Sequence, residues 1–159
     1  MNVVIMDDEP EIVTILTVWL RLRGHFVCPV TSSLALRKEL SERKCDVVLL
    51  DLVMPWANGL TLIEDIRTHS ARTAVLVMSG ITDPRLVVTA CKEGADAYLG
   101  KPIDFEKLER ALSSIEERRA SSFRPQSRGK DEDREIKKNT AVAVDLCRFS
   151  FGCERTNGQ

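Results

Sequence analysis

No stretch of this 159-residue sequence approaches the roughly 18 consecutive apolar residues that a membrane-spanning helix needs. The chain enters an apolar stretch directly after Met1, so the positively charged start of a signal peptide is also missing. Both absences argue against a membrane partner. From the sequence alone we therefore expect a cytoplasmic protein.

An excess of charge of either sign is missing as well. The formal net charge is -1, with 23 Lys and Arg against 24 Asp and Glu, so no long-range field attracts nucleic acid or an anionic membrane. Residues 120–159 carry eight basic and six acidic side chains, an excess too small to argue for nucleic acid. We expect that the chain does not bind DNA by itself.

Cysteine occurs five times, an odd number at irregular spacing. Neither a disulfide framework nor a zinc site uses such a pattern. The five are Cys28, Cys45, Cys91, Cys147 and Cys153, and we interpret most of them as small buried apolar side chains.

The composition divides the chain into two parts. We expect one folded domain over residues 1–119, since the chain is long enough for a single sizeable core. Residues 120–159 are polar and mixed in charge, and are expected to form a largely disordered linker or tail. Alternating apolar residues within 140–151 would suit a short strand there.

Five short apolar runs alternate with segments of helical periodicity. The predicted strands are residues 3–6, 25–30, 47–51, 74–78 and 96–99. The predicted helices are residues 10–23, 34–43, 60–69, 84–93 and 105–115. This alternation implies right-handed crossovers and a parallel sheet covered on both faces. The predicted fold class is α/β: a five-stranded, flavodoxin-like doubly wound sheet in the order 2-1-3-4-5, with five helices.

Local signals place the ends and the inner faces of the helices. In the first helix Ile15, Leu16 and Trp19 fall on the spacing of an apolar stripe, so we expect Trp19 in the core. Asn58-Gly59 is expected to form a turn before the third helix. The expected caps are Ser32 or Ser33, Asp83 and Asp104 at helix starts and Gly24 and Gly94 at helix ends.

Polar residues stand where four of the five strands end. Asp7 and Asp8 follow the first strand, Asp51 ends the third, Ser79 follows the fourth, and Lys101 comes just after the fifth. Strands 1 and 3 lie side by side at the switch point of this topology, and ligands bind beyond the carboxyl ends of the strands. We therefore expect these side chains to share one crevice.

Taken one at a time, these residues have ordinary structural explanations. Asp51 alone could equally be a helix cap or a turn residue. An isolated pair of aspartates is usually a solvated turn, and a lone serine or lysine is usually a cap or a surface residue. Their joint appearance at successive strand ends favours a functional site.

Three carboxylates at one point repel each other, and a divalent cation relieves that repulsion. Mg²⁺ prefers oxygen ligands and combines carboxylates with a phosphate oxygen, so we expect Asp8 and Asp51 as direct ligands, with Asp7 direct or through water. The second oxygen of Asp51 could then attack a phosphoryl group. Lys101 would supply a positive charge for the phosphoryl oxygens and Ser79 a hydroxyl donor.

The motifs form a specific set. In chain order they are Asp7-Asp8-Glu9, Asp51 within DLVMP, Gly59-Leu60, Ser79-Gly80, Tyr98 and Lys101-Pro102. Together they resemble the receiver domain of bacterial two-component response regulators, from residue 2 to about residue 119. Many relatives carry a DNA-binding or enzymatic output domain after the receiver. Residues 120–159 look too few and too polar for one, so we expect the single-domain type with a C-terminal tail.

The resemblance implies that Asp51 accepts a phosphoryl group from a phosphohistidine donor, either a sensor histidine kinase or a phosphotransfer protein. It also implies a Mg²⁺ ion held by Asp7, Asp8, Asp51 and the backbone carbonyl of Val53. The Lys101-Pro102 bond is expected to be cis.

The resemblance further implies a switch. In the family, the hydroxyl at Ser79 moves toward the phosphoryl group and the ring at Tyr98 turns inward. These movements remodel the face made by the fourth helix, the fifth strand and the fifth helix, which then binds a downstream protein target.

Three other classes of protein share parts of this pattern. A transcription regulator would act on DNA through the tail or through a phosphorylation-dependent receiver homodimer, but no helix-turn-helix pattern follows residue 120. A phosphatase of the haloacid dehalogenase type carries a second Asp two residues after its nucleophile, where this chain has Val53. A flavodoxin has a phosphate-binding loop rich in Gly, Ser and Thr after its first strand, and this sequence has no such loop there. We therefore expect a phosphoacceptor signalling domain and not an enzyme. The only reactions that it is expected to catalyse are its own phosphorylation and slow dephosphorylation.

Overall fold

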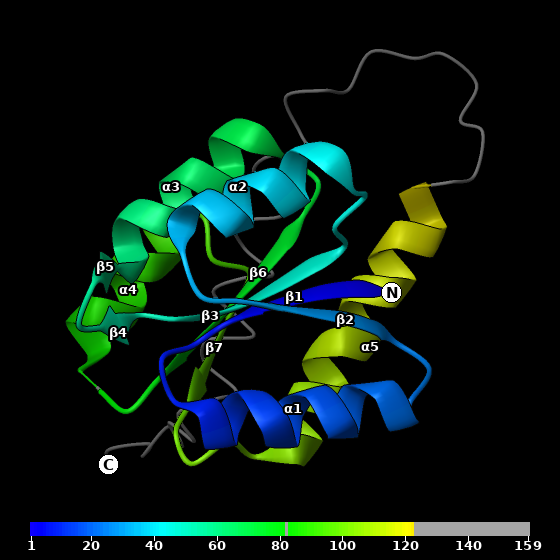
Figure 1. The fold of residues 1–159 in the computed structure, drawn as a ribbon, viewed down its shortest axis with the longest axis horizontal. Coiled ribbons are helices and arrows are strands. Elements are labelled where there is room, and N and C mark those ends of the chain that lie inside the picture. The colour runs from blue at the N-terminus through cyan, green and yellow to red at the C-terminus, as the bar shows by residue number, and fades with distance from the viewer. Residues whose placement is uncertain (82, 123–159) are drawn as a thin grey trace, which may run out of the picture.

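The computed structural model describes residues 1–81 and 83–122 of the chain. These residues form one parallel sheet with helices on both faces (Figure 1). Of the expected tail, only residues 120–122 are described, and the expected short strand at 140–151 lies outside the described residues. Within the described part, no helix is both long enough and apolar enough to cross a membrane.

The sheet contains five strands in the order β2-β1-β3-β6-β7, and each neighbouring pair is parallel. Counted along the chain, this is the order 2-1-3-4-5, so the predicted flavodoxin-like topology is confirmed. The strands are β1 (Asn2–Met6), β2 (Phe26–Val30), β3 (Val47–Asp51), β6 (Ala74–Ser79) and β7 (Ala97–Gly100).

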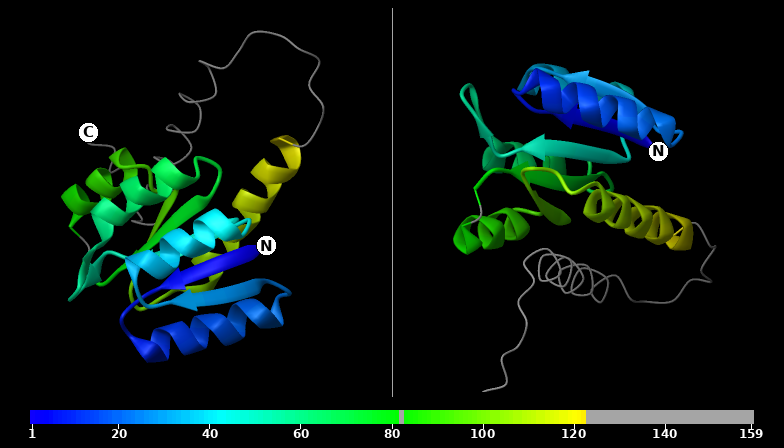
Figure 2. Two further views of the ribbon diagram at one scale, coloured as in Figure 1. Left: turned by 45° about the horizontal axis from the view of Figure 1, so that its top comes forward. Right: turned by 90° about the horizontal axis from the view of Figure 1, so that it is seen from below.

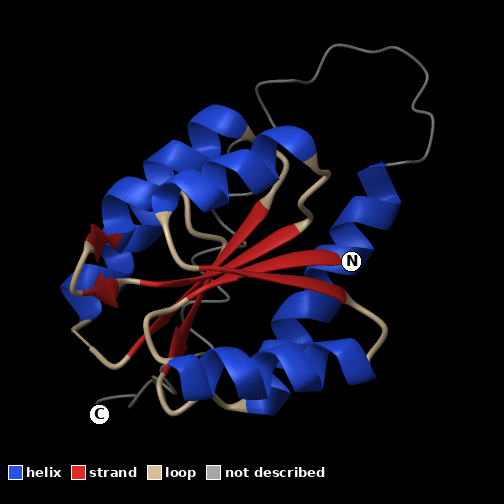
Figure 3. Ribbon diagram, viewed as in Figure 1, coloured by secondary structure: helices blue, strands red, loops and turns tan. Residues whose placement is uncertain are grey.

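Five helices cover the two faces of this sheet. One face carries α1 (Pro10–Leu22) and α5 (Phe105–Ser122), and the other carries α2 (Ser33–Glu42), α3 (Gly59–His69) and α4 (Pro84–Lys92). Figure 3 shows the strands as a layer between these two groups of helices. The fold is therefore a three-layer α/β sandwich.

Alternation along the strands divides the buried side chains between two cores, since successive residues of a strand point to opposite faces. In β1, Val4 packs with α2, α3 and α4, whereas Ile5 packs with α1 and α5. Every residue of β3 is buried, as expected for a parallel strand covered on both sides. Asp51, the last residue of β3, is therefore buried together with the rest of its strand.

A short hairpin follows β3 and was not expected from the sequence. Its strands β4 (Val53–Met54) and β5 (Ala57–Asn58) are antiparallel, and Pro55 and Trp56 lie in the loop between them. The predicted turn at Asn58-Gly59 is therefore wrong in its position. Asn58 instead caps α3, because its side chain accepts a hydrogen bond from the backbone N–H of Leu60 at 3.0 Å.

The predicted caps agree with the structure elsewhere. Ser32, not Ser33, caps α2, and Asp83 caps α4 through the backbone N–H of Arg85. Two backbone N–H groups at the start of α5 donate to the Asp104 carboxylate. Gly24 and Gly94 follow α1 and α4 with positive φ angles of 81° and 110°, a conformation that glycine adopts without strain.

The predicted stripe of α1 is only partly correct. Leu16 is buried, but Ile15 is 55% exposed, because the face of α1 that meets the sheet continues through Leu20 instead. Trp19 is half-buried at the edge of the core, where its ring lies 5.2 Å from that of Phe105.

The three described cysteines are Cys28, Cys45 and Cys91, and no two of them form a disulfide with each other. Cys45 is buried, and burial raises the pKa of its thiol to about 12, so it behaves as a small apolar side chain. Cys28 and Cys91 are half-buried and pack at the edge of the same core. The expected domain end at residue 119 falls inside α5, which continues to Ser122.

Candidate functional site

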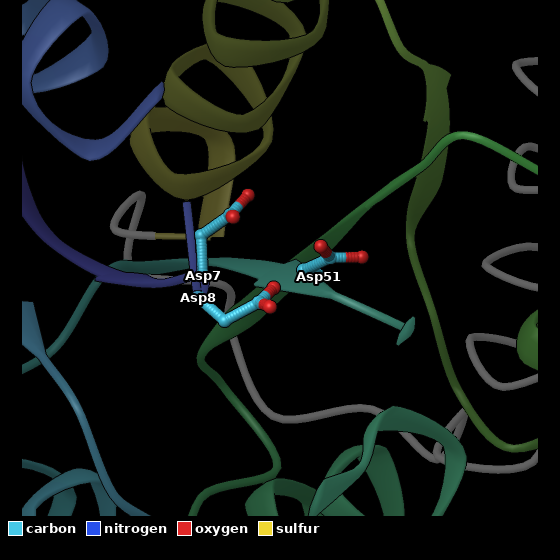
Figure 4. Close-up of side chains that lie close together, drawn as sticks. All are labelled: Asp7, Asp8 and Asp51. Carbon is cyan, nitrogen blue, oxygen red and sulfur yellow. The ribbon is translucent and has the colours of Figure 1, made fainter. Parts of the chain in front are cut away.

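Three carboxylates meet at the carboxyl end of the sheet. Asp7 and Asp8 directly follow β1, and Asp51 ends the neighbouring strand β3. Each of the three offers a carboxylate oxygen, and these oxygens lie within 4.8 Å of one another. Figure 4 shows the three side chains grouped at the ends of the two strands. The parallel register produces this grouping, because it brings the ends of β1 and β3 to the same level.

The three carboxylates differ in exposure. Asp7 is 4% exposed and Asp51 is 3% exposed, while Asp8 is open to solvent. Burial raises the pKa of Asp7, against the lowering effects of a hydrogen bond from the Glu9 backbone N–H and of the nearby Lys101 ammonium. A buried carboxylate with a raised pKa beside other carboxylates favours a bound cation.

Lys101 is the counter-ion of the site. Its Nζ lies 2.7 Å from Asp51 Oδ2, 2.9 Å from Asp7 Oδ2 and 2.7 Å from Glu9 Oε1. Burial alone would disfavour the ammonium form, but the contacts with Asp51, Glu9 and Asp7 outweigh it and raise the pKa of Lys101. The lysine therefore stays charged at neutral pH.

The carboxylate of Asp51 is held at both oxygens. Oδ2 accepts a hydrogen bond from Lys101, and Oδ1 accepts one from the backbone N–H of Val53 at 2.9 Å. Two hydrogen bonds from separate elements leave this side chain little freedom to rotate. Asp51 is thus oriented toward the space beyond the strand ends.

The acidic cluster satisfies a simple test for a divalent cation. Oδ2 of Asp7 is fully buried, and no described residue donates a hydrogen bond to it, although Lys101 Nζ is close enough for an ion pair. A buried oxygen without a donor is ready to coordinate a metal. An all-oxygen donor set from three carboxylates suits Mg²⁺.

Ser79 and Tyr98 meet at one backbone unit on the other side of the site. Ser79 is fully buried at the end of β6, and its Oγ accepts a hydrogen bond from the backbone N–H of Ile81 at 3.1 Å. Tyr98, on β7, is 1% exposed and donates its hydroxyl hydrogen to the carbonyl oxygen of Ile81. The loop from β6 to α4 is therefore linked to both side chains.

Gly59 packs against the backbone at the end of β3. A Cβ atom at this position would lie 2.5 Å from the Cα of Leu52 and 2.8 Å from the carbonyl oxygen of Asp51. Only a hydrogen side chain fits there, so the start of α3 can pack against the end of β3. Gly59 belongs to the motif set found in the sequence, but the steric reason for a glycine at this position is visible only in the structure.

The structure brings together most of the residues that the sequence singled out. Asp7, Asp8, Asp51 and Lys101 converge, and the predicted cis Lys101-Pro102 bond is confirmed. Val53 lies in the hairpin, 51% exposed, with its backbone N–H directed to Asp51.

Two residues at the site were not assigned roles from the sequence. Glu9 reaches Lys101 across 92 positions of the chain, and Ile81 links Ser79 to Tyr98 through its backbone. Glu9 stands in the quoted Asp7-Asp8-Glu9 motif, but nothing in the sequence pattern indicates its partner. Ile81 carries no signal at all, because only its backbone takes part.

Comparison with known proteins gives consistent results. Residues 3–113 match the response regulator receiver domain. The chain is 33% identical over 112 residues to the transcriptional regulatory protein ZraR of Klebsiella oxytoca, covering 70% of this chain and 25% of ZraR. It is 34% identical over 117 residues to the DNA-binding transcriptional regulator NtrC of Azospirillum brasilense, covering 71% of this chain and 24% of NtrC.

These two relatives are much longer proteins, and the chain spans about a quarter of their length. Among solved structures, a response regulator receiver domain protein from Clostridium thermocellum superimposes with a TM-score of 0.69 and 28% identity. That match covers 77% of this chain and 98% of the solved one. Family, fold and strand order agree, and the chain belongs to the response regulator receiver domain family.

Proposed function

We propose that this chain is a response regulator of a two-component phosphorelay, in which Asp51 accepts a phosphoryl group from a phosphohistidine donor. The donor is a sensor histidine kinase or a phosphotransfer protein. An oxygen of the Asp51 carboxylate forms the new O–P bond while the N–P bond of the phosphohistidine breaks. The electron pair of the broken bond stays on the imidazole nitrogen of the donor.

The observation that carries this proposal is the pairing of Asp51 with Lys101 inside a cluster of carboxylates. The Lys101 ammonium lies 2.7 Å from Asp51 Oδ2 and is only 12% exposed. A compact positive charge at this place can transfer its contact from Asp51 to the oxygens of an arriving phosphoryl group. Ser79 can donate its hydroxyl hydrogen to another phosphoryl oxygen.

We further propose that Asp7, Asp8, Asp51 and the backbone carbonyl of Val53 hold Mg²⁺. Bound there, Mg²⁺ would neutralise negative charge on the phosphoryl oxygens. The buried Oδ2 of Asp7, which accepts no hydrogen bond from a described residue, and the three convergent carboxylates support this assignment.

The phosphoryl group on Asp51 is expected to persist. A hydrolase of the haloacid dehalogenase type needs a second acid two residues after the nucleophile, and here that residue is Val53. Without a side chain to activate water, the acyl phosphate should be a signal and not a step of turnover. The chain then catalyses only its own phosphorylation and slow dephosphorylation.

The output of the switch is a protein-binding face made by α4, β7 and α5, which lie on one side of the molecule (Figure 2, right). Ile81, in the loop before α4, is hydrogen-bonded to Ser79 through its N–H and to Tyr98 in β7 through its carbonyl oxygen. A movement of Ser79 toward the phosphoryl group would therefore displace that loop. Val88 on α4 is 52% exposed and Ile81 is 45% exposed, which offers apolar surface to a downstream protein.

The donor is expected to contact α1. This helix starts at Pro10, directly after the acidic turn, and three of its apolar side chains point outward. Ile15, Val18 and Leu22 are 55%, 54% and 79% exposed. Exposed apolar side chains at helical spacing mark an interaction surface, and this one flanks the route to Asp51.

A transcription regulator is the second candidate. It is favoured by the names of the relatives ZraR and NtrC, which are described as a transcriptional regulatory protein and a DNA-binding transcriptional regulator. The shared part of those proteins is the receiver, so DNA binding by this chain would require residues 120–159 or a phosphorylation-dependent homodimer.

The remaining proposals concern organisation and place. We treat residues 1–119 as the phosphoacceptor domain, extended by the last turn of α5, and residues 120–159 as a linker or tail. We place the exchange in the cytoplasm.

The test is to incubate the full chain with acetyl phosphate and Mg²⁺ and to map the modified residue by mass spectrometry. We expect one phosphoryl group, on Asp51, and none when the metal is removed with a chelator. The matched control is the isosteric Asp51→Asn variant, which should not be labelled. Equal labelling of that variant would overturn the assignment of Asp51.

A further inference from the structure

Lys101 contacts three carboxylates, and only one of them is able to move away. Asp7 and Asp51 have side chains that are 0% and 4% exposed, and each accepts a hydrogen bond from a backbone N–H. The side chain of Glu9 is 54% exposed, and its Oε1 accepts a hydrogen bond from Lys101 Nζ at 2.7 Å.

The position of Glu9 has no structural explanation within its own helix. Glu9 is the N-cap residue of α1, yet its side chain makes no capping hydrogen bond. Capping usually falls to shorter polar side chains that bond the backbone of the first turn. The Glu9 carboxylate instead reaches across to the end of β7, while the Glu9 backbone N–H is fixed on Asp7 Oδ1.

An ammonium group has three hydrogens to donate. In this structure Lys101 donates hydrogen bonds to Glu9 and Asp51, and its Nζ forms an ion pair with Asp7 Oδ2 at 2.9 Å. All three carboxylates therefore compete with a phosphoryl oxygen for the ammonium group. When a phosphoryl group arrives, one of these contacts has to be given up. The exposed Glu9 carboxylate is the one whose release costs least, because water can solvate it at once.

We propose that Glu9 is a positioning residue that competes with the incoming phosphoryl group for the ammonium of Lys101, and so slows phosphorylation of Asp51 by anionic donors. Glu9 acts in two ways. It occupies one of the three donors of Lys101, and it places a further negative charge at the exposed side of the site. This inference rests on the proposed function, because it concerns the rate of the same reaction.

The competing interpretation makes Glu9 a metal ligand. Geometry argues against it, because the carboxylate group that converges in the described part of the chain consists of Asp7, Asp8 and Asp51. The two interpretations differ in what a neutral side chain does. Loss of a ligand would weaken Mg²⁺ binding, whereas loss of a competitor would speed phosphorylation.

The experiment compares the wild-type chain with Glu9→Gln and Glu9→Ala. The full chain is incubated with Mg²⁺ and either acetyl phosphate, a dianion, or phosphoramidate, whose net charge is smaller. The rate of Asp51 labelling is measured at low and at high ionic strength, and Mg²⁺ affinity is measured separately by calorimetry. Glu42→Gln is the matched control, since it changes the net charge equally at an exposed position at the end of α2.

We expect both Glu9 variants to be labelled by acetyl phosphate roughly three to ten times faster than the wild type at low ionic strength, as removal of one nearby charge predicts. The gain should be smaller with phosphoramidate and should shrink at high salt. Affinity for Mg²⁺ should stay within about twofold, and the control should behave as the wild type. A purely structural role of Glu9 would not produce this dependence on donor charge and salt.

Two results would overturn the inference while leaving the proposed function in place. One is normal labelling of the wild type with no gain in either Glu9 variant. The other is a loss of Mg²⁺ affinity of about tenfold or more, which would make Glu9 a metal ligand. Failure of the wild type to be labelled on Asp51 by any donor would instead refute the proposed function.

Discussion

Gly59 and Leu52 are packed backbone against backbone at the edge of the site. A Cβ atom on Gly59 would lie 2.5 Å from the Cα of Leu52, and the Gly59 N–H donates to the Leu52 carbonyl oxygen at 3.3 Å. This contact joins the start of α3 to the residue that follows Asp51. The position of Asp51 therefore depends on the absence of a side chain at Gly59, the first residue of α3.

We expect Gly59→Ala to lower the free energy of unfolding by about 1–3 kcal/mol, because the methyl group must push backbone atoms apart. Labelling of Asp51 should also become slower, since the same shift moves its carbonyl group. Urea denaturation measures the first effect. Gly80→Ala is the control, because a Cβ there meets nothing within 4 Å, and it should change stability by less than about 1 kcal/mol. A fully stable Gly59→Ala chain would contradict the packing.

The sequence contains a single tyrosine, so the burial of Tyr98 can be tested directly. Burial raises the pKa of Tyr98 above its ordinary value of 10.0, against the effect of its hydrogen bond with Ser79. The ultraviolet titration of tyrosinate should therefore have its midpoint above that value in the folded chain and near it in denaturant. Because the folded state disfavours tyrosinate, the stability from this group is complete below the ordinary pKa. It is lost as the pH rises through the folded pKa.

Tyr98→Phe should abolish this titration and flatten the alkaline loss of stability. At neutral pH the variant should be less stable by about 1 kcal/mol, because the carbonyl of Ile81 loses its donor. A midpoint at or below the ordinary value in the native chain would mean that Tyr98 is open to solvent.

Asp7 is expected to destabilise the metal-free protein at neutral pH. Its pKa is raised by burial, so the folded state favours the protonated acid. The stability from this group is complete below its ordinary pKa of 3.8 and is lost as the pH rises through the folded value. At pH 7 without Mg²⁺, Asp7→Asn should therefore be more stable than the wild type in thermal unfolding.

Addition of Mg²⁺ should reverse this order. At about 100 times its dissociation constant, the ion stabilises a chain by about 2.7 kcal/mol, and the Asn variant should gain less. Asp83→Asn is the contrasting control, since an ion pair and hydrogen bonds from Arg85 lower the pKa of Asp83. That variant should lose a little stability at neutral pH and respond to Mg²⁺ as the wild type does. An Asp7→Asn chain that gained as much from Mg²⁺ would remove Asp7 from the ligand set.

A substitution of Val18, on the outer face of α1, tests the proposed docking of the donor separately from the chemistry at Asp51. We expect Val18→Glu to slow phosphoryl transfer from a histidine kinase about tenfold or more, because a charge replaces an apolar contact. Labelling by acetyl phosphate should be unchanged, since that donor needs no docking surface. The measurement uses the purified kinase that phosphorylates the wild type fastest. Equal slowing with both donors would show that the substitution disturbs the site itself.

Two ion pairs connect the end of α5 to residues that precede strands of the sheet. Arg119 is ion-paired with Asp46 before β3, and Arg118 lies 3.7 Å from Asp96 before β7. A chain ending at Ser122 should keep both pairs, fold to the same stability and be labelled on Asp51. A chain ending at residue 117 should lose about 1–3 kcal/mol in urea denaturation. Loss of soluble protein from the chain that ends at Ser122 would show that residues 123–159 contribute to folding.

Much of the site was predictable because strand ends are a local property. Apolar runs that finish in Asp51 and Ser79 give both the strand and its polar end, and the parallel topology then brings those ends to one edge. The predictions that failed concern faces and turns. Ile15 falls on the predicted apolar stripe of α1 but is exposed, whereas Leu16 is buried. The turn predicted at Asn58-Gly59 lies instead at Pro55 and Trp56, and Asn58 caps α3. Periodicity places a stripe only to within about one residue of its true direction.

The sequence by itself determined the order of strands and helices, the strand ends that carry Asp7, Asp51, Ser79 and Lys101, and the family. Only the tertiary structure decided that Glu9 contacts Lys101, that Gly59 touches Leu52 and that Tyr98 is buried on Ile81. The physical reason is distance along the chain. Periodicity and caps act within a few residues, whereas these contacts join residues 92, 7 and 17 positions apart and exist only once the layers have packed.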